Sequence, residues 1–306
     1  ALRTLLLFAA SILIFVGTQI LPGDVAQSIL GQAATPQALA NMREQLGLNE
    51  PAHIRYLSWL GDALRGDLGV ALTNGQDIAT AMGRRLSNTL FLAFWAAVVA
   101  VPLAILLGLL AVRFQGRWPD KLISGATLAT ISVPEFLLGY IAMFFLAVQF
   151  RVFPSVATVY DGMPFLDKLN AIALPVLVLV LTVLGHMMRM TRAAILNVMQ
   201  SAYIETAELK GLPTFTVIAR HAFPNAVAPV VNVVMINLAY LVVGVVVVEV
   251  VFVYPGMGQY LVDHVAKRDV PVVQACGLVF AAVYIGLNLV ADVVSILANP
   301  RLRHPK

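Results

Sequence analysis

The sequence predicts an all-α integral membrane protein with about six transmembrane helices. Of its 306 residues, 60% are hydrophobic and 12% are charged, which is roughly half the charged share of a soluble domain. Several apolar runs reach the length of about 18 residues that crosses a bilayer. Because these runs are continuous and lack the alternation of barrel strands, we expect helices rather than a transmembrane barrel.

The first predicted span lies within residues 1–22 and follows Arg3. A signal peptide has a similar pattern, but no convincing small-residue cleavage site follows, so we expect an uncleaved span. Residues 23–85 form a predicted small helical insertion outside the membrane. Within it, Thr35-Pro36 begins one predicted helix that ends at Gly47, and a second helix is expected over 51–64.

Five further spans form the predicted core, residues 86–306. They cover about 86–112, 122–150, 171–188, 226–253 and 272–298. Pro134 and Glu135 interrupt the run over 122–150, where the proline is expected to bend the helix. A long polar segment, 189–225, precedes the fifth span, and residues 254–271 are expected to form a loop.

Basic residues gather on one side of this topology. The N-terminus, the turn at Gly116, the segment 189–225 and the C-terminus carry 11 basic and three acidic residues (11 − 3 = +8), and the other side carries nine and ten (9 − 10 = −1). The positive-inside rule therefore places both termini in the cytoplasm and the insertion outside. The same distribution explains the pI near 9.3, so lipid is the expected contact and no nucleic-acid partner is predicted.

Motifs for chemistry are missing from the sequence. It contains no G-x-x-x-x-G-K-[ST] phosphate loop and no H-E-x-x-H pattern, and its single cysteine is Cys276. Its five histidines are scattered along the chain, so we expect no metal site. The chain is therefore predicted to be no enzyme, with no catalytic residues and no bound cofactor.

Three acids lie within or near predicted spans: Glu135, Glu249 and Asp292. Charge inside a bilayer is costly, which makes such residues functional candidates, with structural pairing as the alternative. Glu135 and Glu249 are the candidates for a translocation path or gate. His186, near the end of the fourth span, is interpreted as a capping or interfacial histidine.

The segment from Tyr203 to Pro224 is a polar island between apolar runs. If it forms a helix, Tyr203, Ala207 and Gly211 share one stripe at i, i+4 and i+8, and the two small residues leave room for another surface. Pro213 is expected to stop the helix. A long polar segment that keeps a helical pattern indicates a docking element for a soluble partner.

This segment resembles the EAA loop of ABC-importer permeases, roughly E-A-A-x3-G-x9-I-x-L-P. The matching residues are Glu205, Ala207, Gly211 and Pro224, whereas Thr206 and His221 depart from the general pattern. The histidine fits the di- and oligopeptide branch of that family. Further resemblance to its B-type permeases lies in Leu21-Pro22-Gly23-Asp24, Gln45-Leu46-Gly47-Leu48, Arg65-Gly66-Asp67-Leu68-Gly69, the run 84–90, the run 248–258 and Asn299-Pro300-Arg301-Leu302-Arg303.

The resemblance implies a type I permease fold in a bacterial or archaeal inner or plasma membrane. It implies three kinds of partner: a second homologous permease, two ATP-binding subunits that hold ATP and Mg²⁺, and a periplasmic or lipoprotein solute-binding protein. The implied function is ATP-driven uptake of di-/oligopeptides or related solutes by alternating access. The implied coupling residues are Tyr203, Glu205, Thr206, Ala207, Lys210, Gly211 and Pro224.

Alternatives remain open at this point. A self-contained ion- or proton-coupled carrier would use Glu135, Glu249 and Asp292, and an intramembrane enzyme is a third possibility. Within the importer family, the sequence leaves the substrate open among dipeptides, oligopeptides, nickel chelates, glutathione and glycosides.

Overall fold

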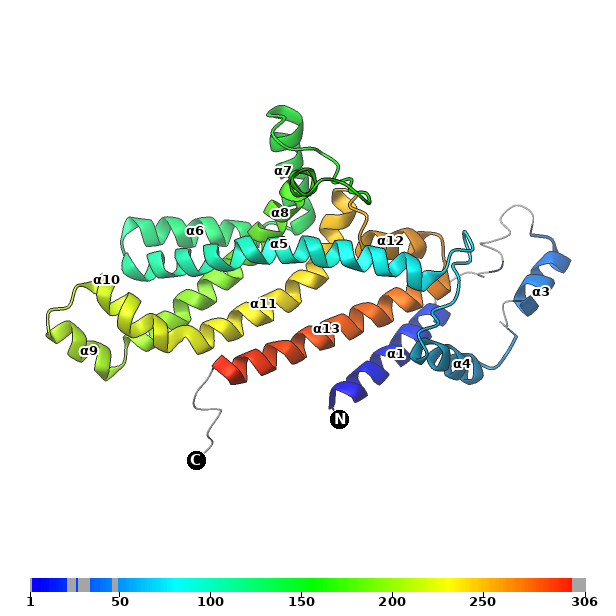
Figure 1. The fold of residues 1–306 in the computed structure, drawn as a ribbon, viewed down its shortest axis with the longest axis horizontal. Coiled ribbons are helices and arrows are strands. Elements are labelled where there is room, and N and C mark those ends of the chain that lie inside the picture. The colour runs from blue at the N-terminus through cyan, green and yellow to red at the C-terminus, as the bar shows by residue number, and fades with distance from the viewer. Residues whose placement is uncertain (1, 21–25, 27–33, 46–48, 299–306) are drawn as a thin grey trace. The chain divides into compact units, whose positions relative to one another are not determined.

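A computed structural model describes residues 2–20, 26, 34–45 and 49–298, and most of these residues lie in helices (Figure 1). In this described part, the only β-type pairing is an isolated bridge between Val70 and Asp77. Five of its helices are long and apolar enough to cross a membrane, or up to six if a bent pair is one span. The predicted all-helical membrane fold is thus confirmed. The motif at 21–24, Gly47 and the ending at 299–303 lie outside the described residues.

The chain divides into two compact units, each built from two segments. Unit 1 comprises Ala1–Thr89 and Pro255–Ile285, and unit 2 comprises Leu90–Tyr254 and Gly286–Lys306. Two long helices contribute residues to both units: α5 (Ile78–Arg113) and α13 (Val270–Ala298). The boundaries after residues 22 and 85 concern membrane topology and stay a prediction.

In unit 1, the helices of the insertion form largely as expected. They are α3 (Pro36–Gln45) and α4 (Ala52–Leu64). Thr35 Oγ1 accepts a hydrogen bond from the Ala38 N–H at 3.2 Å, so the predicted start of α3 is confirmed. The first span is α1 (Leu2–Ile20).

Aromatic contacts join α4 to α1. The ring of Tyr56 lies edge-on to that of Phe15, with 5.3 Å between centroids, and Trp59 is 6.1 Å from the same ring. The Tyr56 hydroxyl lies 2.9 Å from Ser11 Oγ, within hydrogen-bond distance. These contacts give the insertion a fixed place against the first span.

The expected loop over 254–271 is wrong in one respect, because it contains helix α12 (Met257–Ala266). Met257, Tyr260 and His264 are all buried and share one face at i, i+3 and i+7. Met257 and Tyr260 pack into a core with Ile78 and Val272. A face of this width is enough to fold a short helix in a segment too polar to be a span.

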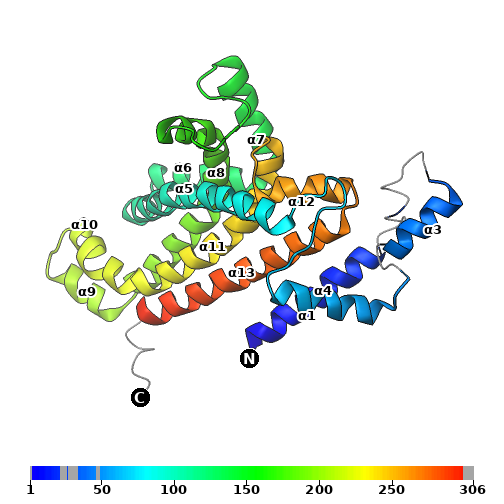
Figure 2. The same cartoon turned by 45° about the vertical axis from the view of Figure 1, so that its right-hand side comes forward.

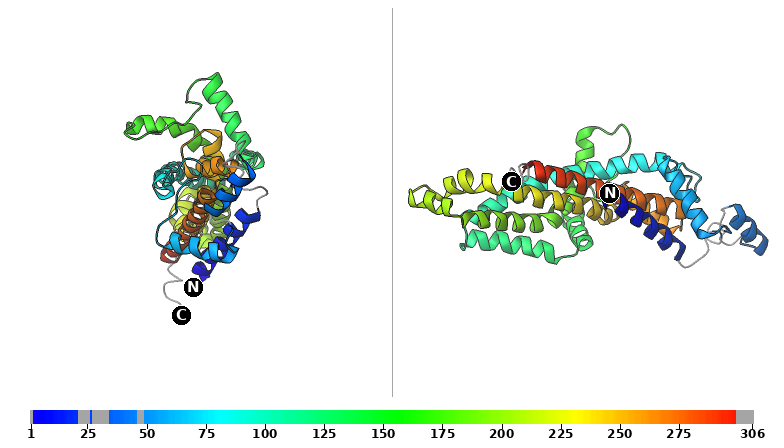
Figure 3. Two further views of the ribbon diagram at one scale, coloured as in Figure 1. Left: turned by 90° about the vertical axis from the view of Figure 1, so that its right-hand side faces the viewer. Right: turned by 90° about the horizontal axis from the view of Figure 1, so that it is seen from below.

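Unit 2 is organised around α8 (Phe165–Met199), which packs against α6 (Trp118–Ser132) and α11 (Phe223–Val251). These three helices run side by side in the right-hand view of Figure 3. The fourth span was predicted to end near residue 188, but α8 continues to Met199. Its buried face persists through Thr191 and Ile195, while the charges that end the hydropathy signal lie on other faces.

The crossing of α6 and α8 is very close at Gly185. A Cβ built on Gly185 would lie 2.6 Å from both the Thr127 carbonyl oxygen and Ile131 Cγ1. Only glycine fits this position without moving a neighbour. Small residues commonly allow such close backbone approach between membrane helices.

The third span is broken, as Pro134 predicts. Its first half is α6, and its second half is α7 (Glu135–Ala142) with a π-helical continuation, η2 (Met143–Gln149). The two halves meet at 105°. Val133 has the extended conformation that is common before proline, so the local sequence accounts for the break.

Candidate functional site

The predicted coupling segment forms a compact cap on two long helices of unit 2. It consists of α9 (Ala202–Leu209), α10 (Thr214–Thr216) and the π-helical η3 (Val217–Ala222). Figure 2 shows α9 and α10 together where α8 ends and α11 begins, and α7 lies toward the opposite ends of these helices. A movement imposed on α9 therefore acts on the ends of both α8 and α11.

One face of α9 is anchored in a hydrophobic core. Ile204 and Ala207 are buried there with Ile195 of α8, Val217 of η3 and Val112 of α5. Ala207 therefore faces its own chain. The prediction that its small side chain leaves an outward docking stripe was wrong, because Ile204 and Ala207 both lie on the buried face of α9.

The outward face of α9 and the turn after it carry the accessible side chains. Tyr203 is 46% exposed, Leu209 is 82% exposed and Phe215 is 63% exposed. The charged residues Glu205 and Lys210 are exposed beside them. Large apolar side chains at the rim of a membrane protein's polar cap form the kind of surface that another protein covers.

Sequence reasoning missed Leu209 and Phe215 as contact residues. The sequence did carry one signal for Leu209, since this apolar residue lies between the charged residues Glu208 and Lys210. The Arg113 guanidinium lies 5.7 Å from the Phe215 ring centroid, which helps to hold this aromatic side chain at the surface.

Gly211 lies beyond the end of α9, so it cannot share a helical stripe with Tyr203. Its φ is +78°, which is the left-handed region that favours glycine. Its N–H donates to the Glu208 carbonyl at 2.8 Å, and the Leu212 N–H donates to the Ala207 carbonyl at 3.4 Å. Gly211 thus ends the helix and turns the chain toward Pro213.

The other predicted coupling residues have identifiable local positions. The Thr206 hydroxyl donates to the Ala202 carbonyl at 3.0 Å, so this departure from the family pattern is accommodated within α9. Pro224 lies at the start of α11, which continues η3 without a break, so its missing N–H falls where the π-helical segment passes into the α-helix. His221 lies in the last turn of η3, and its carbonyl accepts a hydrogen bond from Asn225 Nδ2 at 2.7 Å.

A second feature near the coupling segment, an ion pair, was not predicted. Arg192 of α8 donates to both oxygens of Asp120 of α6, at 3.1 Å from Nε and 2.9 Å from a terminal nitrogen. Asp120 also accepts the Gly116 N–H at 3.0 Å. Its side chain is 8% exposed and that of Arg192 is 28% exposed. This bidentate pair fixes α6 to the part of α8 that leads into α9.

The candidate path residues lie where α7 meets α11. In the described part of the chain, the buried Glu135 Oε1 has no hydrogen-bond partner. A Cβ built on Gly244 of α11 would lie 3.4 Å from this oxygen. Glu249 is five residues further along α11 and is fully buried. His186 and Asp292 lie on exposed faces of α8 and α13.

These features define a multi-pass membrane protein with a folded segment suited to contact another protein. More specifically, the chain belongs to the family described as "Binding-protein-dependent transport system inner membrane component", which matches residues 100–304. Residues 2–91 match the corresponding N-terminal family. The chain is therefore an inner-membrane permease of the ABC-importer type and is not itself the ATPase.

Individual relatives agree with this assignment. The chain is 33% identical over 293 residues to a "Probable peptide ABC transporter permease protein" of Sinorhizobium fredii (strain NBRC 101917 / NGR234), covering 96% of this chain and 94% of the relative. It is 35% identical over 298 residues to the glutathione transport system permease protein of Escherichia coli (strain K12), covering 97% and 95%.

A solved structure shares the fold. It is an inward-facing MetNI methionine ABC transporter, with a TM-score of 0.51 and 16% sequence identity over 72% of this chain and 96% of that chain. This likeness confirms the predicted permease fold. The family match favours the importer over a self-contained carrier that uses Glu135, Glu249 and Asp292.

Proposed function

We propose that this chain is one permease subunit of an ATP-driven importer for di-/oligopeptides or related solutes. The family membership and the peptide- and glutathione-transport relatives support this substrate class. In this proposal a solute-binding protein delivers the solute on the outer side. A second, homologous permease supplies the other half of the translocation path, and both termini of this chain lie in the cytoplasm.

The observation that carries the proposal is the exposed face of α9, which is tied by its buried face to the ends of the spans. We propose that one of two ATPase subunits, which bind ATP and Mg²⁺, covers Tyr203, Glu205, Leu209 and Lys210. ATP-driven movement of that subunit would then pass through the α9 core contacts to α8 and α11. In this arrangement Gly211 and Pro224 shape the segment, and Ala207 anchors it.

The test replaces Leu209 with glutamate. Leu209 ends α9 and is 82% exposed, and its matched control is Leu64, which ends α4 and is 81% exposed. Burial of a leucine side chain contributes roughly 2 kcal/mol to a contact. Leu209→Glu should therefore reduce copurification of the ATPase, and ATP-driven uptake, by about tenfold or more. Leu64→Glu should leave both unchanged.

Both variants should insert into the membrane in normal amounts, since neither side chain is in a core. Normal ATPase copurification and normal uptake with Leu209→Glu would overturn the docking role of α9.

We also propose that Glu135 lines the translocation path at the break in the third span. The support is the buried Glu135 Oε1, which lacks a hydrogen-bond partner among the described residues and could bond a polar solute. Glu249 lies on the same helix as Gly244 but is fully buried, so a gating role for it would require movement of α7 relative to α11.

A further inference from the structure

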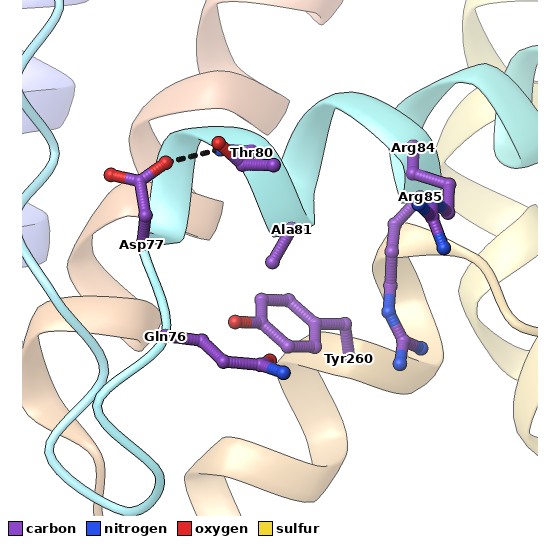
Figure 4. A pocket seen from close by; sticks show the side chains of 7 residues that line it. All are labelled: Gln76, Asp77, Thr80, Ala81, Arg84, Arg85 and Tyr260. Carbon is purple, nitrogen blue, oxygen red and sulfur yellow. Dashed lines mark hydrogen bonds between the residues drawn. The ribbon is translucent and has the colours of Figure 1, made fainter.

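A pocket in unit 1 is not used by any function described above. It lies between the first turns of α5 and the middle of α12, and its volume is about 400 Å³ (Figure 4). This volume falls within the roughly 300–1,000 Å³ range of small-molecule sites. Its lining includes Gln76, Asp77, Thr80, Arg84, Arg85 and Tyr260.

The charged side chains of the pocket favour an anion. Two arginines and one aspartate give the lining a net charge of +1 (2 − 1), and behind the lining the buried Asp269 is close enough to raise the pKa of Tyr260. The carboxylate of Asp77 caps α5, because it accepts the Thr80 N–H at 2.7 Å. Hydrogen bonds from the Thr80 side chain and backbone hold the pKa of Asp77 below its usual range. The Asp77 carboxylate is thus engaged by the first turn of α5.

Arg85 is the side chain best placed to meet a ligand. Its guanidinium lies over the Tyr260 ring, 4.8 Å from the centroid, and this stacking fixes its position. Within the described part of the chain, no acid forms an ion pair with Arg85. A guanidinium that is held in place without an acidic partner can donate two parallel N–H hydrogen bonds to a carboxylate.

Two further donors lie beside it. Gln76 Oε1 accepts a hydrogen bond from Asn74 Nδ2 at 3.2 Å, which leaves the Gln76 amide N–H groups available. Figure 4 shows the Gln76 side chain running alongside the Tyr260 ring. Tyr260 is only 3% exposed, and among the described residues its hydroxyl has no hydrogen-bond partner. A buried hydroxyl without a partner is costly, and a bound acceptor would remove that cost.

We propose that this pocket binds the free C-terminal carboxylate of a peptide, with Arg85 as its counter-charge and Gln76 and Tyr260 as hydrogen-bond donors. The sequence places this end of α5 on the outer side of the membrane, where an imported solute arrives. The pocket would thus select peptides that have an unblocked C-terminus. This inference rests on the proposed peptide-type function.

The test compares trialanine with trialanine amide, which lacks the carboxylate. Binding of each labelled peptide is measured by equilibrium dialysis on the purified transporter complex, without its solute-binding protein. The readout is the affinity ratio of trialanine to its amide. Arg85→Gln should lower this ratio about tenfold, since hydrogen bonds between charged groups are the strong ones. The control is Arg65→Gln, which removes an 81% exposed arginine of the same unit from outside the pocket.

Tyr260→Phe is the second variant, since it keeps the ring beneath Arg85 and removes only the unpartnered hydroxyl. It should lower the same ratio by about threefold and leave the complex assembled. A wild-type complex that binds both peptides equally, or a ratio that neither variant changes, overturns the pocket's role. The proposed function fails separately, if the wild-type complex with its solute-binding protein imports no peptide.

Discussion

Gly185 offers the sharpest test of how unit 2 is packed. Gly185→Ala would place a methyl group 2.6 Å from the Thr127 carbonyl oxygen and Ile131 Cγ1. Ordinary contact begins at 3.4 Å, so α6 and α8 must separate by 0.8 Å (3.4 − 2.6). The backbone oxygen cannot rotate away as the end of a side chain can, and the separation would weaken packing along the whole crossing.

The cost of this separation can be estimated. Overpacking of a well-filled site costs about 1–3 kcal/mol, and a backbone neighbour places this case at the upper end of that range. The better helix propensity of alanine returns up to about 1 kcal/mol. The expected net loss is about 2 kcal/mol, which lowers the melting temperature by roughly 3 °C for a chain of 306 residues.

The assay is thermal unfolding of the purified chain in detergent, followed by the fluorescence of its three tryptophans. The matched control is Gly125→Ala, on α6 itself, where a Cβ would meet nothing within 4 Å. This variant should melt at or slightly above the wild-type temperature. If Gly185→Ala melts as high as Gly125→Ala, the close crossing of α6 and α8 is refuted.

Two further predictions concern charges in unit 2. Asp120→Asn leaves Arg192 without its acidic partner and should lower the free energy of unfolding by about 2 kcal/mol, because that arginine is only 28% exposed. The control is Asp62→Asn, which breaks the exposed pair with Arg65 and should cost under about 0.5 kcal/mol in the same unfolding assay. An equal cost for the two would contradict the structural importance of the Asp120 pair. Glu135→Gln should reduce ATP-driven uptake by about tenfold without lowering the melting temperature, because the buried Glu135 Oε1 has no partner to lose in the described part of the chain. If Glu135→Gln lowers the melting temperature and leaves uptake normal, the role of Glu135 is structural.

The sequence was sufficient for features that depend on local chemistry. Apolar runs located the spans, Thr35 marked a helix start and Pro134 marked the break in the third span. The ends of helices were less predictable. Hydropathy stops at the first charges after residue 188, but α8 continues because a buried face with Thr191 and Ile195 persists.

The candidate site shows the same limit. The position of the coupling segment followed from its polarity, but its orientation did not. The i, i+4, i+8 spacing could not show that α9 ends at Leu209, since Gly211 leaves the helix through a left-handed turn. Nor could it show which face is buried, because that depends on Ile195 and Val217 from other helices. The Asp120–Arg192 pair joins residues 72 positions apart, and one sequence carries no signal for it.

The length of α8, which continues through Pro175, has a mechanical consequence. Its 35 residues form a rod of about 52 Å, and a tilt of about 10° around its centre would carry each end through roughly 4.5 Å. The Gly185 crossing holds α6 against the rod, and the Asp120 pair holds it again about two turns further on. A small swing imposed at α9 would therefore reach the far end of α8 as a displacement of the opposite sense. If an ATPase drives α9 as proposed, α8 would act as a lever, and the Gly185 crossing and the Asp120 pair would then affect transport without contacting the solute.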